Sequence, residues 1–183
     1  MWDIIGALLS LSATLAFIVL SWWAWPMSLL ASVVNAGLYA HHHLLGDTVL
    51  ELLYAGIAIV GIYRWRFSDS PRLKRTSRLS SQAVWLVALS AVLGFFLIYI
   101  SLIKIGVAKL PFWDAGTTIG SLIAEWLTVQ KKIACWVWWF VVDMIYAAIY
   151  WNQGLPAHTI VLMSYLVLAV LGYRRWQRVV QEE

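Results

Sequence analysis

YAGIAIVGIYRW, at residues 54–65, is matched 111 positions later by YLVLAVLGYRRW, at residues 165–176. The two segments carry Tyr, Ala, Gly, Arg and Trp at the same places. The same offset aligns residues 2–66 with residues 113–177 without a gap, and 15 of these 65 pairs are identical. A gap-free match of this length indicates an internal duplication. We therefore expect one three-dimensional unit to be used twice.

The composition is typical of a protein that crosses a membrane several times. Of the 183 residues, 62% are hydrophobic and 12% are charged, and the mean hydropathy is +0.78. A soluble domain has about one quarter charged residues, whereas long uncharged runs joined by short polar segments indicate membrane spans. The first run lacks the positively charged start of a cleavable signal, so we expect it to remain in the mature protein.

Seven apolar segments have the length that a tilted helix needs to cross a bilayer. No charged residue separates the first two segments, so Pro26, which suits the first turn of a new helix, marks the break between them. The sequence therefore predicts an all-α membrane protein with seven transmembrane helices. The segments cover residues 4–20, 22–41, 48–65, 82–103, 114–130, 133–151 and 157–175.

The basic residues predict the orientation of the chain. Eleven of the 13 Lys and Arg residues fall between the third and fourth segments, between the fifth and sixth, or after the seventh. With seven spans these clusters lie on one side, which the positive-inside rule assigns to the cytoplasm. We expect the N-terminus outside and the C-terminus inside. The basic pI near 9.3 could indicate nucleic-acid binding, but these clusters account for it as determinants of topology. No nucleic-acid partner is therefore expected.

The duplication divides the chain into three parts. Residues 1–66 are a first three-helix repeat, residues 67–110 a basic cytoplasmic loop with the unrepeated fourth helix, and residues 111–183 a second repeat with the cytoplasmic C-terminus. Four crossings separate the two repeat starts, so both repeats enter the membrane in the same direction. Parallel repeats of this kind occur in transporters whose substrate site lies between the halves. A structural bundle is the alternative.

Three carboxylates interrupt the apolar segments. Asp143 lies in the middle of the sixth segment, Glu51 near the start of the third and Glu125 deep in the fifth. A charged side chain at mid-membrane costs at least roughly 2.5–3.5 kcal/mol, so such residues usually face the protein interior or water. Each acid is protonated, bonded to a neighbouring helix, or a ligand for a substrate. Because no Lys or Arg lies at matching depth, a cationic substrate is favoured.

Tryptophans accompany the acid of the sixth segment. Trp136, Trp139 and Asp143 follow one another at spacings of three and four residues, which places them on one helical face. Indole rings bind cations and flat heteroaromatic rings. Other tryptophans stand at segment ends, where an interfacial belt is the usual role. We assign the belt to Trp22, Trp23, Trp65, Trp113 and Trp176.

Asn35, Tyr54 and Thr118 are weaker candidates for contact with the substrate. Each places a polar group within an apolar segment, although such groups commonly serve helix packing. The other candidate site residues are Glu51, Glu125 and the three residues on one face of the sixth segment, Trp136, Trp139 and Asp143.

No metal or cofactor site is predicted. His41, His42 and His43 are consecutive, and consecutive helical residues point about 100° apart, so they cannot chelate from one face. The single cysteine, Cys135, excludes an intramolecular disulfide and a thiolate zinc cluster. No catalytic motif is present, so we expect no enzyme. An intramembrane hydrolase using Asp143 and His158 is a remote alternative.

The chain resembles the bacterial Pnu vitamin transporters. The resemblance rests on PFWD at residues 111–114, the W-x-x-W-x-x-x-D pattern that ends at Asp143, and the G-x-x-x-W that ends each repeat. With the 3+1+3 plan it covers essentially the whole chain. It implies a SWEET-like bundle of the inner membrane, often a homotrimer, through which an unphosphorylated vitamin diffuses before cytoplasmic phosphorylation traps it.

The resemblance also implies roles for particular residues. Trp136, Trp139 and Asp143 would line the substrate site, and Glu51 stands where nicotinamide riboside transporters of the family carry Gln. Asp143 replaces a frequent Asn, and Glu125 adds a third acid. Nicotinamide riboside and thiamine are both flat-ringed cations, and the extra acids favour thiamine slightly. We expect facilitated diffusion of one of them by alternating access of the two repeats, with a sealed receptor or assembly protein as the alternative.

Overall fold

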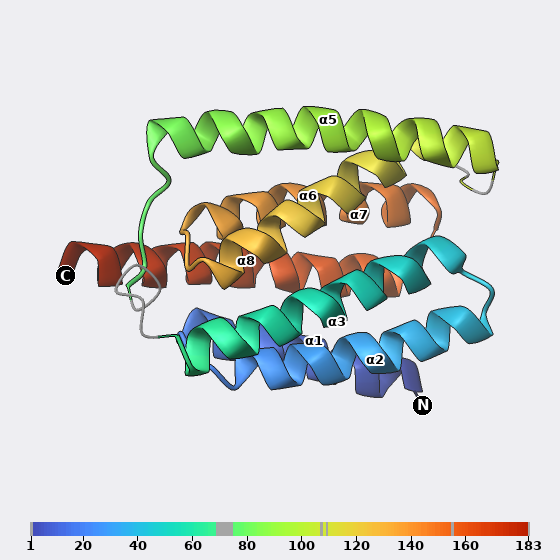
Figure 1. Ribbon diagram of the computed structural model, residues 1–183. Helices are drawn as coiled ribbons and strands as arrows, with labels where there is room; N and C mark the ends of the chain where they lie inside the picture. The colour runs from blue at the N-terminus through green and yellow to red at the C-terminus, as the bar shows by residue number, and fades with distance from the viewer. Residues whose placement is uncertain (1, 69–74, 107, 109, 155, 183) are drawn as a thin grey trace. The chain divides into compact units, whose positions relative to one another are not determined.

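The computed structural model describes residues 2–68, 75–106, 108, 110–154 and 156–182. Each helix in this part of the chain coincides with one predicted segment, which confirms the predicted all-helical class. Arg72, Lys74 and Lys109, which the topology prediction used, lie outside the described residues. The helices, labelled in Figure 1, are α1 (Trp2–Ile18), α2 (Ala24–His41), α3 (Leu45–Arg66), α5 (Ser81–Ile105), α6 (Pro111–Val129), α7 (Ala134–Asn152) and α8 (Pro156–Glu182).

Four of the described helices, α3, α5, α7 and α8, are long and apolar enough to cross a membrane. Helix α1 contributes a shorter apolar stretch, Ile5–Ile18. Helices α2 and α6 are more polar, since α2 includes Asn35 and His41 and α6 includes Asp114 and Glu125. Length and composition therefore give four candidate spans among the seven described helices.

Local sequence signals explain where several helices begin and end. Pro26 falls in the first turn of α2, as predicted, and Pro111 opens α6, where its missing N–H breaks no helical hydrogen bond. The Ser80 side chain caps α5 by accepting a hydrogen bond from Ala83 N at 3.2 Å. Gly106 ends α5 in the left-handed conformation, with φ 73°.

Helix α8 extends beyond the predicted end of the seventh segment. The apolar run stops near residue 175, but the helix continues to Glu182. Residues 174–182 contain no Gly or Pro and several Arg and Gln residues, which favour helix. The end of the apolar run therefore does not mark the end of the helix.

The helix bounds repeat at the offset of 111 residues. Helices α1 and α6 end at residues 18 and 129, α2 and α7 end at 41 and 152, and α3 and α8 begin at 45 and 156. The corners repeat as well. Leu20 and Lys131 have φ 57° and 52°, and His43 and Gly154 have φ 58° and 71°. Non-glycine residues rarely adopt positive φ, so the two matched pairs of corners are strong support for duplication.

Burial follows the same offset. The identical pairs Ala13 and Ala124, Ala36 and Ala147, and Ala58 and Ala169 are buried in both copies. Small residues let helix backbones approach closely within a membrane. The duplication therefore preserved small residues at several places where helices pack.

The residues form two compact units, each of which makes most of its contacts within itself. Unit 1 comprises Met1–Thr76, Val129–Lys131 and Leu171–Glu183, and unit 2 comprises Ser77–Thr128 and Lys132–Val170. In unit 1, α2 packs against both α1 and α3, and Figure 1 shows α2 and α3 side by side. The end of α8 belongs to unit 1, so this unit joins parts of both repeats.

Two indole hydrogen bonds hold unit 1 together in a reciprocal way. Trp65 Nε1, on α3, donates to Val129 O at 3.1 Å, and Trp176 Nε1, on α8, donates to Phe17 O at 3.0 Å. The last tryptophan of each repeat therefore binds a carbonyl in the last turn of the other repeat's first helix. Carbonyls at helix ends lack intrahelical donors; the indole of Trp65 supplies one for Val129 O, and that of Trp176 adds a second for Phe17 O, which also accepts from Leu20 N.

The belt prediction is wrong for Trp176. Its side chain is 0% exposed, so it cannot lie at the lipid interface. Trp65 is part-buried and its ring centroid lies 6.3 Å from that of Trp176 and 5.9 Å from that of Phe17. Trp23 and Trp113 are 59% and 47% exposed, as a belt residue would be. Position at the end of an apolar segment did not reveal which indoles turn inward.

Gly61 makes room for this aromatic cluster. A Cβ atom at Gly61 would overlap the indole of Trp25, which is 0% exposed. The Trp25 ring meets Phe17 edge to face at 4.7 Å, an arrangement that aromatic pairs prefer. Glycine at position 61 is therefore required by the packing of α3 against α2.

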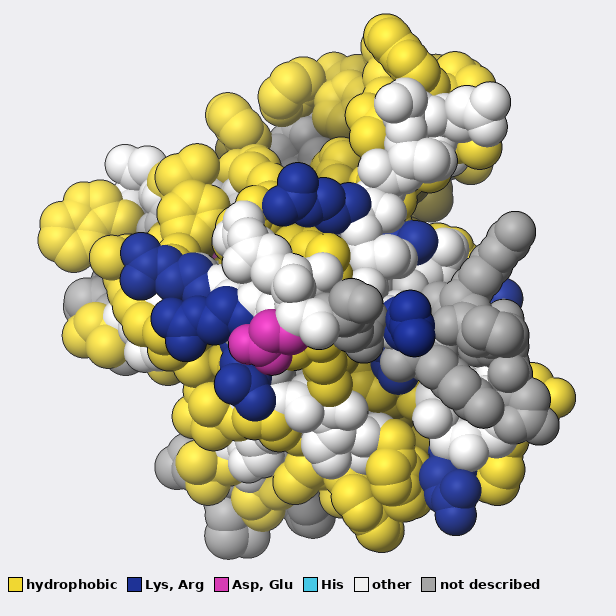
Figure 2. Space-filling view, turned by 90° about the vertical axis from the view of Figure 1, so that its left-hand side faces the viewer, with side chains coloured by type: hydrophobic (Ala, Val, Ile, Leu, Met, Phe, Trp, Pro, Cys, Tyr) yellow, Lys and Arg dark blue, Asp and Glu magenta, His cyan; other side chains and the backbone are white. Residues whose placement is uncertain are grey.

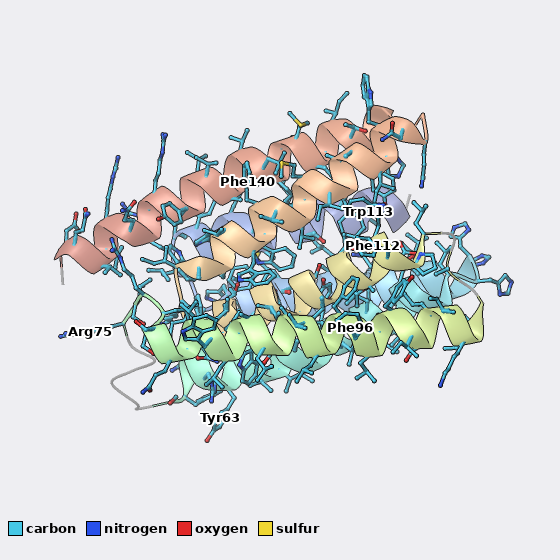
Figure 3. All side chains as sticks on the ribbon, turned by 90° about the horizontal axis from the view of Figure 1, so that it is seen from above. Tyr63, Arg75, Phe96, Phe112, Trp113 and Phe140 are labelled. Carbon is cyan, nitrogen blue, oxygen red and sulfur yellow. The ribbon has the colours of Figure 1, made fainter. Side chains whose placement is uncertain are left out.

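Unit 2 also packs through glycines. A Cβ atom at Gly120 of α6 would lie 2.7 Å from a methyl carbon of Val142 on α7. Near the start of α6, Phe112, labelled in Figure 3, meets Phe95 of α5 edge to face at 5.2 Å. No described residue of α5 is buried, although this helix is among the four membrane-span candidates.

Basic residues gather where α3 and α8 end in unit 1. The C-terminal ends of both helices lie on the left in Figure 1, and Figure 2, which faces that side, shows Lys and Arg side chains gathered there. Helix α3 ends with Arg64 and Arg66. Helix α8 carries Arg174, Arg175 and Arg178 close to its end.

Candidate functional site

In unit 1, the structure joins two of the predicted site residues. Asn35 Nδ2 on α2 donates to Glu51 Oε1 on α3 at 3.2 Å. The buried Ser32 hydroxyl, one turn before Asn35, also bonds the Glu51 side chain, and Asp47 lies close enough to repel it. Two neutral groups thus hold the carboxylate of Glu51 in place, as buried polar groups require.

A close approach of α1 to α2 supports this polar cluster. A Cβ atom at Gly6 would overlap the amide oxygen of Asn35. The side-chain amide of Asn35 is therefore held between the α1 backbone and Glu51. Tyr54 follows Glu51 by three residues on α3 and is part-buried.

In unit 2, Trp136, Trp139 and Asp143 lie on α7 at the predicted spacing. Trp136 is 4% exposed, and Trp139 and Asp143 are part-buried. No hydrogen bond or ion pair from another described residue reaches the Asp143 carboxylate. An acid inside a membrane protein usually has a partner, so Asp143 differs from Glu51, whose partners are protein side chains.

Glu125 is the most deeply buried of the predicted acids, at 5% exposure on α6. It lies near Cys135, whose thiol bonds the buried Thr128 side chain. Thr118 is part-buried, whereas its neighbour Thr117 is 1% exposed and donates to Trp113 O at 2.9 Å. Helix packing accounts for Thr117 and leaves Thr118 the more accessible hydroxyl.

The candidates fall into two groups, each within its own unit. Asn35, Glu51 and Tyr54 belong to unit 1, and the others belong to unit 2. The histidines at the end of α2 are exposed, and within the described residues no three His, Cys, Asp or Glu side chains form a possible metal site. His158 is exposed too, with its ring 5.4 Å from that of Tyr150.

Ser32 is a member of the Glu51 cluster that the sequence reasoning missed. The internal repeat contained the signal, because the offset of 111 pairs Ser32 with Asp143. It also pairs Asn35 with Tyr146 and Glu51 with Leu162. Among these paired positions each repeat has one carboxylate. In the first repeat it is Glu51 on α3, and in the second it is Asp143 on α7.

A family model, two curated proteins and a solved structure each match most of the chain. The family model for the nicotinamide mononucleotide transporters matches residues 1–178. A riboflavin/roseoflavin transporter, RibM, from Streptomyces davaonensis is 24% identical over 95% of this chain and 83% of its own length. A nicotinamide riboside transporter, PnuC, from Neisseria mucosa is 26% identical over 83% of this chain, which spans 64% of that relative's length. The crystal structure of the vitamin B3 transporter PnuC superposes with a TM-score of 0.79 at 21% identity, covering 97% of this chain and 81% of that one.

Proposed function

Because the chain belongs to the nicotinamide mononucleotide transporter family, whose relatives above are transporters and not enzymes, we propose that it carries an unphosphorylated cationic vitamin. The candidate substrates are thiamine and nicotinamide riboside. Family membership and the apolar helices indicate a bacterial inner membrane. Within it we propose that the N-terminus is outside and the C-terminus is cytoplasmic, as the positive-inside rule predicts.

The observation that carries this proposal is the isolated carboxylate of Asp143. It is part-buried on an apolar helix, and no described side chain or backbone group bonds it. Trp139 precedes it by one helical turn, and Trp136 by two. A cation that binds there gains both the carboxylate charge and the faces of the indoles. This pairing explains why an acid stands within the apolar stretch CWVWWFVVD.

The remaining candidates complete the proposed site. Glu51, oriented by Asn35 and Ser32, would supply a second carboxylate from the first repeat. Tyr54, Thr118 and Glu125 are further substrate contacts in this proposal. The repeated helix bounds support a SWEET-like 3+1+3 division into residues 1–66, 67–110 and 111–183.

The proposed mechanism is facilitated diffusion by alternating access. The two repeats open the site in turn to the outside and to the cytoplasm, moving about the unrepeated helix α5. Phosphorylation of the vitamin in the cytoplasm maintains the gradient, so the carrier itself needs no energy source. A homotrimer, as the resemblance implies, would contain three independent sites.

Binding and uptake measured on the purified protein test the proposal. Thiamine, nicotinamide riboside and the uncharged riboflavin are titrated against the protein, with quenching of tryptophan fluorescence as the signal. Tighter binding of a cation than of riboflavin, together with uptake of that cation into liposomes, is the expected result. Preference for riboflavin would reject the cationic substrate. Binding without uptake would favour a receptor. Absence of both binding and uptake would favour an assembly protein.

A further inference from the structure

An exposed aromatic cluster surrounds Arg66 at the end of α3, and the proposed transport does not use it. The Arg66 guanidinium carbon lies 5.6 Å from the ring centroid of Trp22 and 5.5 Å from that of Phe67. The Trp22 and Trp23 rings are 4.3 Å apart. Trp23 and Phe67 are 59% and 63% exposed. All four residues belong to unit 1.

The charge of Arg66 is not neutralised within the described part of the chain. No carboxylate of a described residue forms an ion pair with it, and its guanidinium lies over the two rings. The backbone amides at the nearby start of α2 are already used. Ala24 N donates to Ser21 O, Trp25 N to Trp22 O and Met27 N to Trp23 O, at 3.1–3.2 Å. An anion at this corner would therefore bind the guanidinium.

The second repeat shows that the helical scaffold does not need this cluster. The offset of 111 pairs Trp22 with Ile133 and Arg66 with Gln177. The corresponding corners nevertheless have the same conformation, with φ 57° at Leu20 and 52° at Lys131. Because the same backbone forms without these side chains, their presence in the first repeat points to a separate role.

The surroundings fit the boundary between lipid tails and headgroups. Helix α3 is a membrane-span candidate, and Arg66 is its last residue. Tyr63, one turn earlier, is 66% exposed and points away from the helices in Figure 3. Its ring lies 6.4 Å from that of Phe67. Aromatic side chains at a span end sit at headgroup depth, which places Arg66 beside lipid phosphates.

We propose that Arg66, with Trp22, Trp23 and Phe67, binds the headgroup of an anionic phospholipid. The guanidinium bonds the phosphate, for which its planar donors are suited. The exposed rings contact the glycerol and the first acyl carbons. Anionic rather than zwitterionic lipid is favoured because neighbouring Arg64 and the arginines of α8 add positive charge at this end of unit 1.

Lipid binding by the intact protein tests this inference without any vitamin. Short-chain phosphatidylglycerol and phosphatidylcholine are titrated against detergent-purified protein, and lipid adducts are counted by native mass spectrometry. Arg66→Gln gives the first repeat the residue of the second, and Arg178→Gln removes an equal charge elsewhere on the same unit. Size-exclusion profiles establish that both variants fold.

Wild type should prefer phosphatidylglycerol, and Arg66→Gln should weaken that binding roughly tenfold, as expected for loss of a charge-assisted hydrogen bond. Arg178→Gln should change it less than about twofold. Equal losses in both variants would show a diffuse charge effect and overturn the site. Competition by inorganic phosphate at the same concentration as lipid would identify a phosphate site and overturn the lipid assignment. Failure of vitamin transport would leave this result unaffected, because the assay contains no vitamin.

Discussion

Helices α1–α3 and helices α6–α8 match in their bounds but differ in several polar side chains. Their helix bounds and left-handed corners coincide at the offset of 111 residues. The acids within their apolar segments do not coincide, because Glu51 pairs with Leu162 and Asp143 with Ser32, although Asp3 and Asp114 at the helix starts do. The Glu51 carboxylate bonds neighbours within the first repeat, whereas the Asp143 carboxylate has no bond to a described residue. Packing constrains the residues of both repeats in the same way. A substrate contact is needed only once, so the polar residues could diverge.

The largest expected effect separates the two acids. Asp143→Asn removes the charge that no described protein group compensates, so the dissociation constant for a cationic vitamin should rise about 100-fold. Riboflavin, which is uncharged, should bind within about threefold of wild type. Fluorescence titration of both ligands measures the difference. Equal loss for the two ligands would show that Asp143 acts through structure rather than charge.

The next effect concerns packing in the first repeat. Gly61→Val inserts a branched side chain where a single Cβ already overlaps Trp25, so the free energy of unfolding should fall by about 2 kcal/mol. Gly56→Ala is the matched control, because a Cβ at Gly56 meets nothing within 4 Å on the same helix. It should stabilise slightly through helix propensity. Thermal unfolding in detergent compares them, and similar midpoints would contradict the tight contact.

A smaller effect is expected at the acid of the first repeat. Glu51→Gln keeps an acceptor for Asn35 and Ser32 and removes only the charge, so cation binding should weaken about tenfold or less. Glu182→Gln, at the exposed end of α8, is the control and should leave binding unchanged. If Glu51→Gln weakens binding more than Asp143→Asn does, the roles of the two repeats are the reverse of those proposed.

The smallest difference tests the reciprocal indole bonds. Trp65→Phe leaves Val129 O without a hydrogen-bond donor among the described residues, whereas Phe17 O still accepts from Leu20 N at 3.0 Å when Trp176 is replaced by Phe. Each change should lower the free energy of unfolding by about 1 kcal/mol or slightly more, with the larger cost for Trp65. Thermal midpoints measure both, and a clearly larger cost for Trp176→Phe would show that ring burial outweighs the hydrogen bond.

Much of the fold could be predicted because it depends on the length and repetition of apolar runs. Most segment ends, the break near Pro26 and the offset of 111 residues appear in the structure as helix bounds, although α8 continues to Glu182. The rotation of each helix about its axis could not be predicted. That rotation buries Trp176 and exposes Trp23, although both stand at segment ends.

The candidate site also contains residues that the sequence could predict and residues that it could not. Asp143, Glu51 and Asn35 were identifiable because polar groups inside apolar helices are costly and therefore need a reason. Ser32 and Gly6 were not identified, because a serine or glycine in a membrane helix is common and inexpensive. Their importance depends on what lies opposite them, the carboxylate of Glu51 and the amide of Asn35.

The sequence by itself determined that this chain is helical, membrane-embedded and duplicated, since hydrophobicity and repetition act along one dimension. Only the tertiary structure decided that each repeat's last indole binds the other repeat's first helix, and that Glu51 has protein partners while Asp143 bonds no described residue. The reason is that hydrogen bonds between helices depend on distances of a few ångströms across residues far apart in the chain, which no local pattern encodes.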